Sequence, residues 1–363
     1  MLKKYSFNLS NFLLILTIFF LLHHFSLWYL TKNSLHSTYE AILSGWDSGH
    51  YSGIVSRGYD THSIAFYPLY PLLVKILSFL FPKSFSFSVI GTIFSTLLFC
   101  IFIFFQYKFS KSNLNLPNWL VPKTWTGYFL LIYAPVSYIF HSNHTEALFL
   151  LLSFFAFLHS FQKKWFIASI FAGLCALTKN QGIVLSIAIA LFSATHYTSY
   201  KEKIRIFILS GGVSFLFFLT FLIYQYIKFG NFFSFIIAQK YWHTKTLTET
   251  ILHPFLILYH FREQNFFYEY EIIYYIILLI STILLLKKSK IIFFYVISCL
   301  ALALNDGGFE TAFRFSVFLF PLLFTLGDYI ASKNKFILFL LVIFFFYLNH
   351  QMARNFVLTR WCY

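Results

Sequence analysis

Charged residues, and acidic ones above all, are scarce in this sequence. Only 11% of the 363 residues are charged and only 12 are Asp or Glu, whereas a soluble domain carries about 25% charged residues. Apolar residues reach 59%, and they occur in runs long enough to cross a bilayer. This composition excludes an ordinary soluble domain and predicts an all-α polytopic membrane protein.

Cysteine is also scarce, and its four positions are scattered. No Cys-x-x-Cys or Cys/His spacing occurs, so the sequence indicates neither a structural zinc site nor a disulfide framework. A glycine-rich phosphate-binding loop is missing as well. Any chemistry is therefore expected in a cavity of the membrane part of the chain.

Eleven apolar runs predict transmembrane helices. They lie near 12–30, 85–107, 125–141, 145–161, 164–179, 181–197, 204–227, 270–286, 290–304, 312–330 and 336–349. The first run follows two lysines and is too long for a cleaved signal peptide, so we expect a retained signal-anchor helix. The run 66–82 is apolar too, but its three prolines favour a re-entrant or interfacial helix.

The basic residues predict the orientation of these helices. With the N-terminus in the cytoplasm, 15 basic and two acidic residues fall inside, a net charge of +13, whereas 12 basic and ten acidic residues fall outside, a net charge of +2. This distribution follows the positive-inside rule. The total charge of +15 is thus explained by the lipid bilayer and indicates no nucleic-acid partner.

The outer side is expected to carry the function. Its two long polar segments are 31–65 and 228–269, whereas the inner loops are short. We therefore predict one transmembrane domain over 1–363 with its active site facing the periplasm, for a bacterial inner membrane, or the lumen, for an endoplasmic reticulum membrane. The segment 31–65 is the expected catalytic loop.

Several reactive side chains gather in the first outer loop. Asp47, His50 and Tyr51 stand at i, i+3 and i+4, so that a helix would place them on one face. A confined aspartate can act as a general base toward a hydroxyl, and Arg57 could hold a phosphate. Helix capping or a surface ion pair explains Asp47 and Asp60 equally well on position alone.

Two tyrosines follow within a proline-containing run. Tyr67 and Tyr70 lie in the sequence Phe-Tyr-Pro-Leu-Tyr-Pro at 66–71. They could anchor the segment at the membrane interface, or they could stack on a sugar or line a lipid groove.

These motifs resemble the GPI mannosyltransferase 2 (PIG-V) family of GT-C membrane glycosyltransferases and its bacterial relatives. The first part of the resemblance is Trp46-Asp47-x-x-His50-Tyr51, followed by Arg57-Gly58-Tyr59 and the run 65–71. Further segments resemble the family in the same order, at 145–152, 176–182, 229–242 and 313–322. Lys179 stands where the family often has Arg, and His144 stands where it has Tyr.

The resemblance implies a GT-C fold of about 11 transmembrane helices and an inverting transfer. The expected donor is a polyprenyl-phosphate hexose, most readily mannose, and the expected acceptor is a hydroxyl of a glycan or lipid. Asp47 would be the catalytic base. The resemblance also implies substrate-binding roles for Trp46, His50, Tyr51, Arg57, Asp60, Tyr67, Tyr70, Glu146, Lys179, Gln239, Trp242 and Arg314.

Polar residues beside apolar runs are costly and therefore suggest function, although each has a structural alternative. Glu146, with His141 and His144, could bind a divalent cation, or it could be a charge favoured at a helix N-terminus. Lys179 could meet a phosphate or reach toward the interface. Arg314 could contact a lipid phosphate or pair with Glu310 four residues earlier. No cofactor is required by these patterns.

Gln239 and Trp242 belong to a polar and aromatic strip that suits the edge of a sugar. An amphipathic helix at the membrane interface explains the same strip. A transporter or lipid-linked sugar scramblase is the alternative function, but such proteins commonly contain repeats and acids near the middle of the membrane. A ligase that takes a lipid-linked oligosaccharide is a third, and the Trp-Asp motif argues against it.

Overall fold

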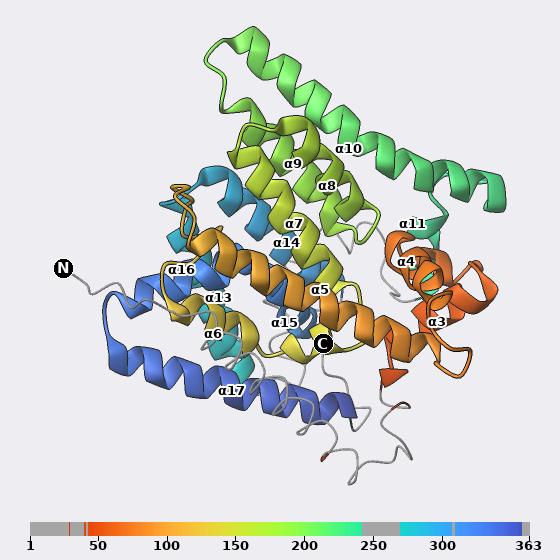
Figure 1. The fold of residues 1–363 in the computed structure, drawn as a ribbon, viewed down its shortest axis with the longest axis horizontal. Helices are drawn as coiled ribbons and strands as arrows, with labels where there is room; N and C mark the ends of the chain where they lie inside the picture. Colours follow the sequence, from red (N-terminus) through yellow and green to blue (C-terminus); the bar gives the residue numbers. More distant parts are fainter. Residues whose placement is uncertain (1–28, 30–39, 41–42, 242–268, 307–308, 358–363) are drawn as a thin grey trace.

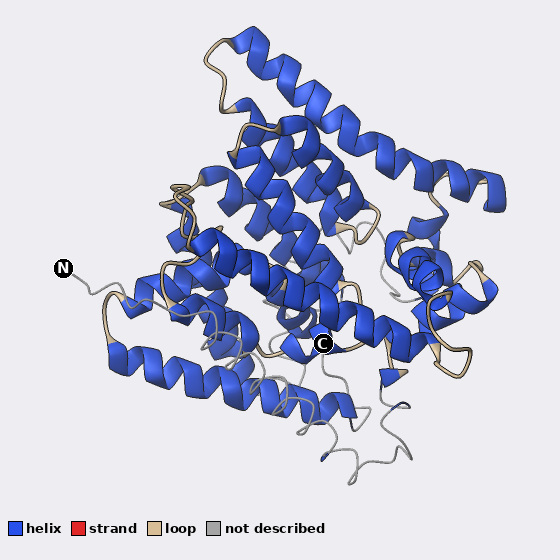
Figure 2. Ribbon diagram, in the orientation of Figure 1, coloured by secondary structure: helices blue, strands red, loops and turns tan. Residues whose placement is uncertain are grey.

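The computed structural model describes Tyr29, Glu40 and residues 43–241, 269–306 and 309–357 (Figure 1). Every regular element in these ranges is a helix (Figure 2). In chain order the elements are α3 (Asp47–Arg57), η1 (Ser63–Ala65), α4 (Leu69–Ser78), α5 (Phe87–Ser110), α6 (Trp125–Ile132), η2 (Ser137–His141), α7 (Glu146–Phe161), α8 (Trp165–Ala176), α9 (Gln181–Ala194), α10 (Tyr200–Phe229), α11 (Ser234–Ala238), η3 (Gln239–Tyr241), α13 (Glu269–Leu286), α14 (Lys290–Asp306), α15 (Phe309–Val317), α16 (Phe320–Ala331) and α17 (Lys335–Val357).

The helices pack in two groups. Helices α7, α8, α9 and α10 form one group, whereas in the other group α13 packs on both α14 and α16, and α16 packs on α6 and α17. Helix α5 crosses beside α7, and α14 contacts α9, so the two groups share one core. Helices α3 and α4 lie beside the first turns of α5 (Figure 1). This end of the molecule positions the candidate site.

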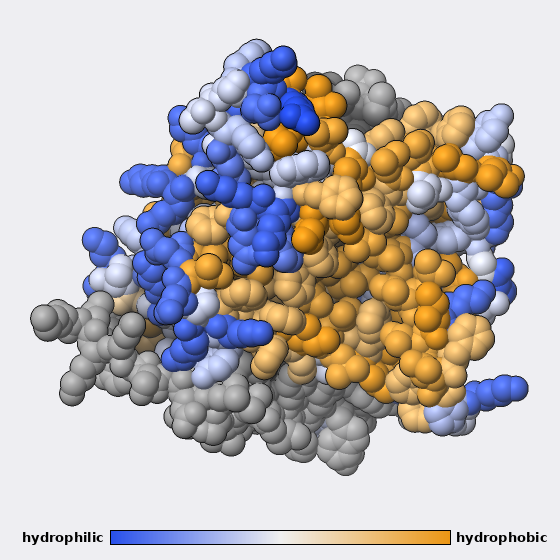
Figure 3. Space-filling view, turned by 45° about the horizontal axis from the view of Figure 1, so that its top comes forward, coloured by the Kyte–Doolittle hydropathy of each residue, from blue (hydrophilic) through white to orange (hydrophobic). Residues whose placement is uncertain are grey.

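Within the described residues, three helices are long and apolar enough to cross a membrane. They are α5, α10 and the part of α17 from Phe336 to Val357. The last turn of α5 and the first turns of α10 and α17 lie on the same side of the molecule, at the left in Figure 1. Figure 3 shows a broad apolar face with hydrophilic margins on both sides. The described residues therefore form an α-helical protein with an exterior suited to a bilayer, and the number of crossings stays a prediction.

Two of the expected spans are not continuous helices, and the reason is proline. The run 125–141 contains α6, which ends at Ile132 just before Pro135, and then the short 3₁₀ helix η2. The run 312–330 is divided between α15 and α16, with Pro321 in the first turn of α16. Proline donates no backbone hydrogen bond and disfavours helix in the preceding residue, so each run breaks there.

The segment 66–82 forms a short helix rather than a span. Helix α4 has 10 residues and is therefore about 15 Å long, roughly half the hydrocarbon thickness. Leu72, Ile76, Phe79 and Leu80 on and after this helix are more than half exposed. The helix is too short to be a full span, and its interfacial or re-entrant placement stays a prediction. The expected first span, 12–30, lies outside the described residues.

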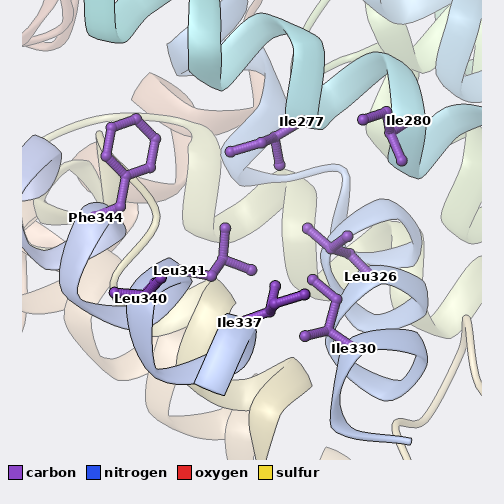
Figure 4. A pocket seen from close by; sticks show the side chains of 8 residues that line it. All are labelled: Ile277, Ile280, Leu326, Ile330, Ile337, Leu340, Leu341 and Phe344. Carbon is purple, nitrogen blue, oxygen red and sulfur yellow. The ribbon is translucent and has the colours of Figure 1, made fainter. Parts of the chain in front are cut away.

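An apolar groove of about 320 Å³ lies between α13, α16 and α17 (Figure 4). Its lining is entirely aliphatic and aromatic: Ile277, Ile280, Leu326, Ile330, Ile337, Leu340, Leu341 and Phe344. No polar group in this lining could orient a hydrophilic substrate, so the groove belongs to the apolar exterior and not to the candidate site.

Helices α6 and α16 approach closely through two glycines. A Cβ on Gly327 would lie 2.5 Å from the backbone nitrogen of Gly127, and rigid backbone cannot move away at low cost. We expect Gly327→Ala to destabilise the protein by about 1–3 kcal/mol, measured as a lower melting temperature in detergent. Gly212→Ala on α10 is the control because a Cβ there meets nothing within 4 Å, and an unchanged Gly327→Ala melt would contradict the close crossing.

Candidate functional site

Four charged side chains from four distant segments meet in one cluster. The Arg314 guanidinium contacts the Asp47 carboxylate through Nη1, at 2.6 Å from Oδ2. Its Nε donates to Oε1 of Glu146 at 2.6 Å. The Lys179 ammonium donates to the same Glu146 oxygen at 2.5 Å. A continuous chain of ion pairs therefore runs from Asp47 through Arg314 and Glu146 to Lys179.

Three charges of this cluster lie at the helix end that favours their sign. Asp47 and Glu146 are the first residues of α3 and α7, where the positive end of the helix dipole favours an acid. Arg314 is in the last turn of α15, and Lys179 lies just beyond the end of α8. The negative end of a helix favours cations, which suits Arg314, whereas Lys179 lies between the end of α8 and the start of α9.

The cluster is buried at one end and partly open at the other. The Glu146 side chain is fully buried, and those of Lys179 and Arg314 are 10% and 11% exposed. Asp47 is the most open member, with 24% of its side chain exposed. A ligand that approaches from outside therefore reaches Asp47 and Arg314 before it reaches Glu146.

Aromatic rings hold the lysine of the cluster in place. The Lys179 ammonium lies 5.2 Å from the ring centre of Phe315 and 5.0 Å from that of Phe318, a distance at which a cation is attracted to the ring face. Both rings follow Arg314 in the sequence, so the end of α15 supplies one cation and supports the other.

The cluster has two acids and two bases and is therefore neutral as a whole. Buried ion pairs contribute little net stability, because desolvation offsets their attraction, whereas removal of one partner is costly. Ionisable groups gathered in this way are characteristic of functional sites. Folding alone gives no reason to assemble four of them from so far apart in the sequence.

A buried asparagine, which we did not predict from the sequence, fixes the first loop beneath the cluster. The Asn143 amide donates to the Ser48 carbonyl at 3.1 Å and to the Ser52 hydroxyl at 3.2 Å, which holds the first turns of α3. Its carbonyl oxygen accepts from the Tyr70 hydroxyl at 3.0 Å. Gly91 makes room for it, because a Cβ there would lie 1.8 Å from Asn143 Oδ1. Its position in the polar segment 141–146, between two apolar runs, was the available signal.

Tyr51 and His50 lie beside the cluster on α3. The buried Tyr51 ring packs edge-on against Phe66 and Tyr70, and burial, with Asp47 next, raises the pKa of its hydroxyl. His50 is exposed and stacks on Phe66 at 5.0 Å. Helix α3 is thus present, but the three side chains do not share one environment, because Tyr51 is buried and His50 is exposed.

Trp46 has an unusual backbone conformation immediately before Asp47. Its φ of 57° and ψ of −139° lie in a region that costs a non-glycine residue about 1–3 kcal/mol. The side chain packs against the main core. Strain of this kind persists where the surroundings fix it, and here it sets the direction in which α3 presents Asp47.

Arg57 and Asp60 lie outside the cluster. Asp60 accepts hydrogen bonds from the Ser63 nitrogen and hydroxyl, at 2.7 and 2.8 Å, and from the His62 nitrogen at 3.0 Å. Those bonds, with the Ser63 backbone first, lower the pKa of its carboxyl. The capping alternative therefore describes Asp60. Arg57 is an exposed residue in the last turn of α3.

The two tyrosines of the proline-containing run are also packed inside the protein. Tyr70 is fully buried, and its hydroxyl bonds to the Gly91 carbonyl at 3.0 Å and to the Ser95 hydroxyl at 2.8 Å. Tyr67 lies among the rings of Phe218, Phe221 and Phe235. Both side chains thus join the first loop to the helices around it.

The structure describes only part of the polar and aromatic strip that contains Gln239 and Trp242. Gln239 is half-buried at the start of η3, and no ion pair or hydrogen bond described here joins it to the four charges. Trp242 lies outside the described residues. The side chain of Glu310, the alternative partner of Arg314, also lies outside them. Among the described side chains Arg314 pairs with Asp47 and Glu146, and the alternative pair with Glu310 stays a prediction.

The candidate metal set does not come together. No group of three His, Cys, Asp or Glu side chains within the described ranges is placed to hold a metal ion. His141 packs edge-on against Phe99, and His144 Nδ1 lies 2.8 Å from the Ser142 hydroxyl. Glu146 binds two cations of the protein itself, so the described residues favour ion pairing over metal binding.

His144 gives the site a pH-dependent stability. Burial, together with Arg314, lowers its pKa from 6.5 to about 4. The unfolded chain therefore binds a proton that the folded chain rejects between pH 4 and 6.5, and stability falls as the pH drops through this window. We expect a loss of about 2 kcal/mol between pH 7 and pH 5, measured by thermal unfolding.

His144→Gln should remove this part of the pH dependence because Gln does not titrate. His350→Gln, on an exposed position of α17, is the matched control and should retain it. An unchanged pH slope in His144→Gln would show that His144 is not the group responsible.

The pKa of Asp47 is set by opposing influences. Burial alone would raise it, but the Arg314 guanidinium and then His144 lower it, and the net direction is downward. Asp47 is therefore an ionised carboxylate at neutral pH. Its pairing with Arg314 also makes it a weaker base than an unpaired aspartate.

Comparisons of the chain with family models, with curated proteins and with solved structures find no match. The resemblance to the GPI mannosyltransferase 2 family thus depends on the sequence motifs alone. Four residues within those motifs, namely Asp47, Glu146, Lys179 and Arg314, meet in the ion-pair cluster. The function is therefore inferred from the geometry of this cluster.

Proposed function

We propose that this protein is a membrane glycosyltransferase that transfers a hexose, most readily mannose, from a polyprenyl-phosphate donor to a hydroxyl acceptor on the outer face. One observation carries the proposal: a partly exposed carboxylate, Asp47, is held against a buried cation, Arg314, which shares the acid Glu146 with a second buried cation, Lys179. A base next to an anion-binding pair is what transfer from a lipid phosphate requires.

The reaction would proceed by direct displacement at the anomeric carbon. Asp47 takes the proton of the acceptor hydroxyl, whose oxygen attacks the anomeric carbon from the side opposite the phosphate. The bond between this carbon and the phosphate oxygen breaks, its electron pair stays with the phosphate, and the configuration inverts. The products are the glycosylated acceptor and polyprenyl phosphate.

Arg314 and Lys179 would stabilise the departing phosphate. Negative charge grows on this group as the bond breaks, and preorganised cations at that place supply a large part of the rate. Arg314 suits this task because its planar guanidinium can donate two hydrogen bonds to phosphate. Glu146 would keep both cations in position without contacting the substrate.

The orientation predicted from the sequence supports the proposal. It assigned the segments containing Asp47, Glu146, Lys179 and Arg314 to the outer side, and a cluster requires all four at one depth. A transporter would be expected to bring such charges to the middle of its bundle, whereas here they gather at helix ends.

The experiment supplies polyprenyl-phosphate [³H]mannose to membranes that contain the protein, then separates donor, lipid and polymer fractions. Covalent transfer that depends on expression of the chain is the expected result. Membranes with Glu202→Gln serve as the control, since Glu202 forms only an exposed pair with Arg205 at 3.6 Å. Label that crosses the bilayer but stays on the donor would favour a scramblase instead.

A further inference from the structure

We infer that the Asp47 carboxylate occupies the anion site of this protein, and that the donor phosphate binds by taking its place on Arg314. The inference rests on the proposed function, because it concerns the same cluster. It adds an order of events: the base is released for catalysis only when a lipid phosphate is bound.

The charges of the cluster support an exchange. Without Asp47, the remaining residues Arg314, Lys179 and Glu146 carry one net positive charge and therefore suit one more anion. In the structure that anion is Asp47, whose Oδ2 lies 2.6 Å from Arg314 Nη1. A phosphate and the Asp47 carboxylate would compete for the same guanidinium edge, since both are planar or tetrahedral oxyanions that accept from it.

Burial decides which carboxylate would leave. Glu146 has a fully buried side chain and contacts both Arg314 and Lys179, so its displacement would leave two cations without their acid. Asp47 contacts only Arg314 among the ion pairs of the described residues and is 24% exposed. The exchange therefore takes place at Asp47 and leaves the inner pairs intact.

The exchange would also change the chemistry of Asp47. While Arg314 is paired with it, the carboxylate is stabilised and accepts a proton reluctantly. After a phosphate has taken the guanidinium, Asp47 lies beside a new negative charge, and its affinity for a proton rises. The enzyme would thus gain its base at the moment when the donor arrives, which implies that the donor binds before the acceptor.

The test measures binding of a sugar-free polyprenyl phosphate to the purified protein in detergent, for example by tryptophan fluorescence. Asp47→Asn should bind it at least about tenfold more tightly than wild type, a difference of about 1.4 kcal/mol, because the competing anion is gone. Arg314→Gln should bind it at least about tenfold more weakly. Asp47→Ser repeats the test with a second uncharged side chain, in case Asp47→Asn does not fold.

Two further probes make the result specific. Polyprenol without phosphate should bind wild type and Asp47→Asn equally, because it presents no anion. Inorganic phosphate at the same concentration should not bind detectably, and binding equal to that of the lipid would overturn the assignment to a lipid phosphate. Equal or weaker binding of polyprenyl phosphate by Asp47→Asn and Asp47→Ser would overturn the exchange.

The binding test is independent of the transfer reaction. Tighter binding by Asp47→Asn in a protein that transfers no hexose would support the exchange and refute the proposed function. Hexose transfer by wild type without tighter binding by the variant would refute the exchange and leave the proposed function standing.

Discussion

Asp47→Asn should reduce hexose transfer by roughly 10²–10⁴-fold, the usual contribution of a positioned general base. Asn has nearly the same size as Asp and can still accept a hydrogen bond from Arg314, so the first turn of α3 should stay in place. The loss should therefore fall on the rate of transfer rather than on the amount of folded protein. The measurement is the initial transfer rate in membranes that contain equal amounts of protein.

Two controls sharpen the Asp47→Asn experiment. Glu202→Gln removes one acid from an exposed pair and should retain the full rate, since surface ion pairs contribute little. A melting temperature of Asp47→Asn close to that of wild type shows that the fold is intact. Transfer at the wild-type rate by folded Asp47→Asn would remove Asp47 from the reaction.

Glu146→Gln should have the largest effect on stability. Glu146 is fully buried and is the common partner of Lys179 and Arg314. Its neutral substitute leaves Lys179 without an acid, and an uncompensated buried charge costs about 3–5 kcal/mol. We expect a large fall in melting temperature and loss of transfer, measured on purified protein in detergent.

A double variant separates the two consequences of Glu146→Gln. Glu146→Gln with Lys179→Met removes both the acid and the cation it left unpaired, so the melting temperature should recover in part. Transfer should stay lost, because Lys179 is one of the proposed phosphate ligands. Additive losses of stability in the double variant would show that Glu146 and Lys179 do not depend on one another.

The sequence indicated the members of the cluster but not their pairing. Asp47, Glu146, Lys179 and Arg314 were visible as ionisable residues beside apolar runs. The pairing of Arg314 with Glu146 was not visible, because the two residues lie 168 positions apart. Local spacing gives neighbours on one helix, and tertiary packing chose partners from other helices.

The positions of the helices were predictable where the length of an apolar run determines them. They were not predictable where a proline interrupts the run. Helices α5, α7 and α10 lie where apolar runs predicted them. The runs 125–141 and 312–330 contain breaks at Pro135 and Pro321, because hydropathy alone does not register the loss of a backbone donor.

Asn143 shows a second limit of prediction from the sequence, which concerns partners that are far apart in the chain. Its bonding partners Ser48, Ser52 and Tyr70 lie 95, 91 and 73 positions away. A buried polar residue has a hydrogen-bond partner, but one sequence reveals neither that Asn143 is buried nor which residues are its partners. The support beneath α3 therefore became visible only in three dimensions.

The most direct measurement of the central claim uses the purified wild-type protein in proteoliposomes with polyprenyl-phosphate [³H]mannose and a lipid and glycan extract as acceptor. The account predicts that label moves to the acceptor fraction and that one polyprenyl phosphate is released for each hexose transferred. Label that stays on the donor, with this or any other polyprenyl-phosphate hexose, would contradict it.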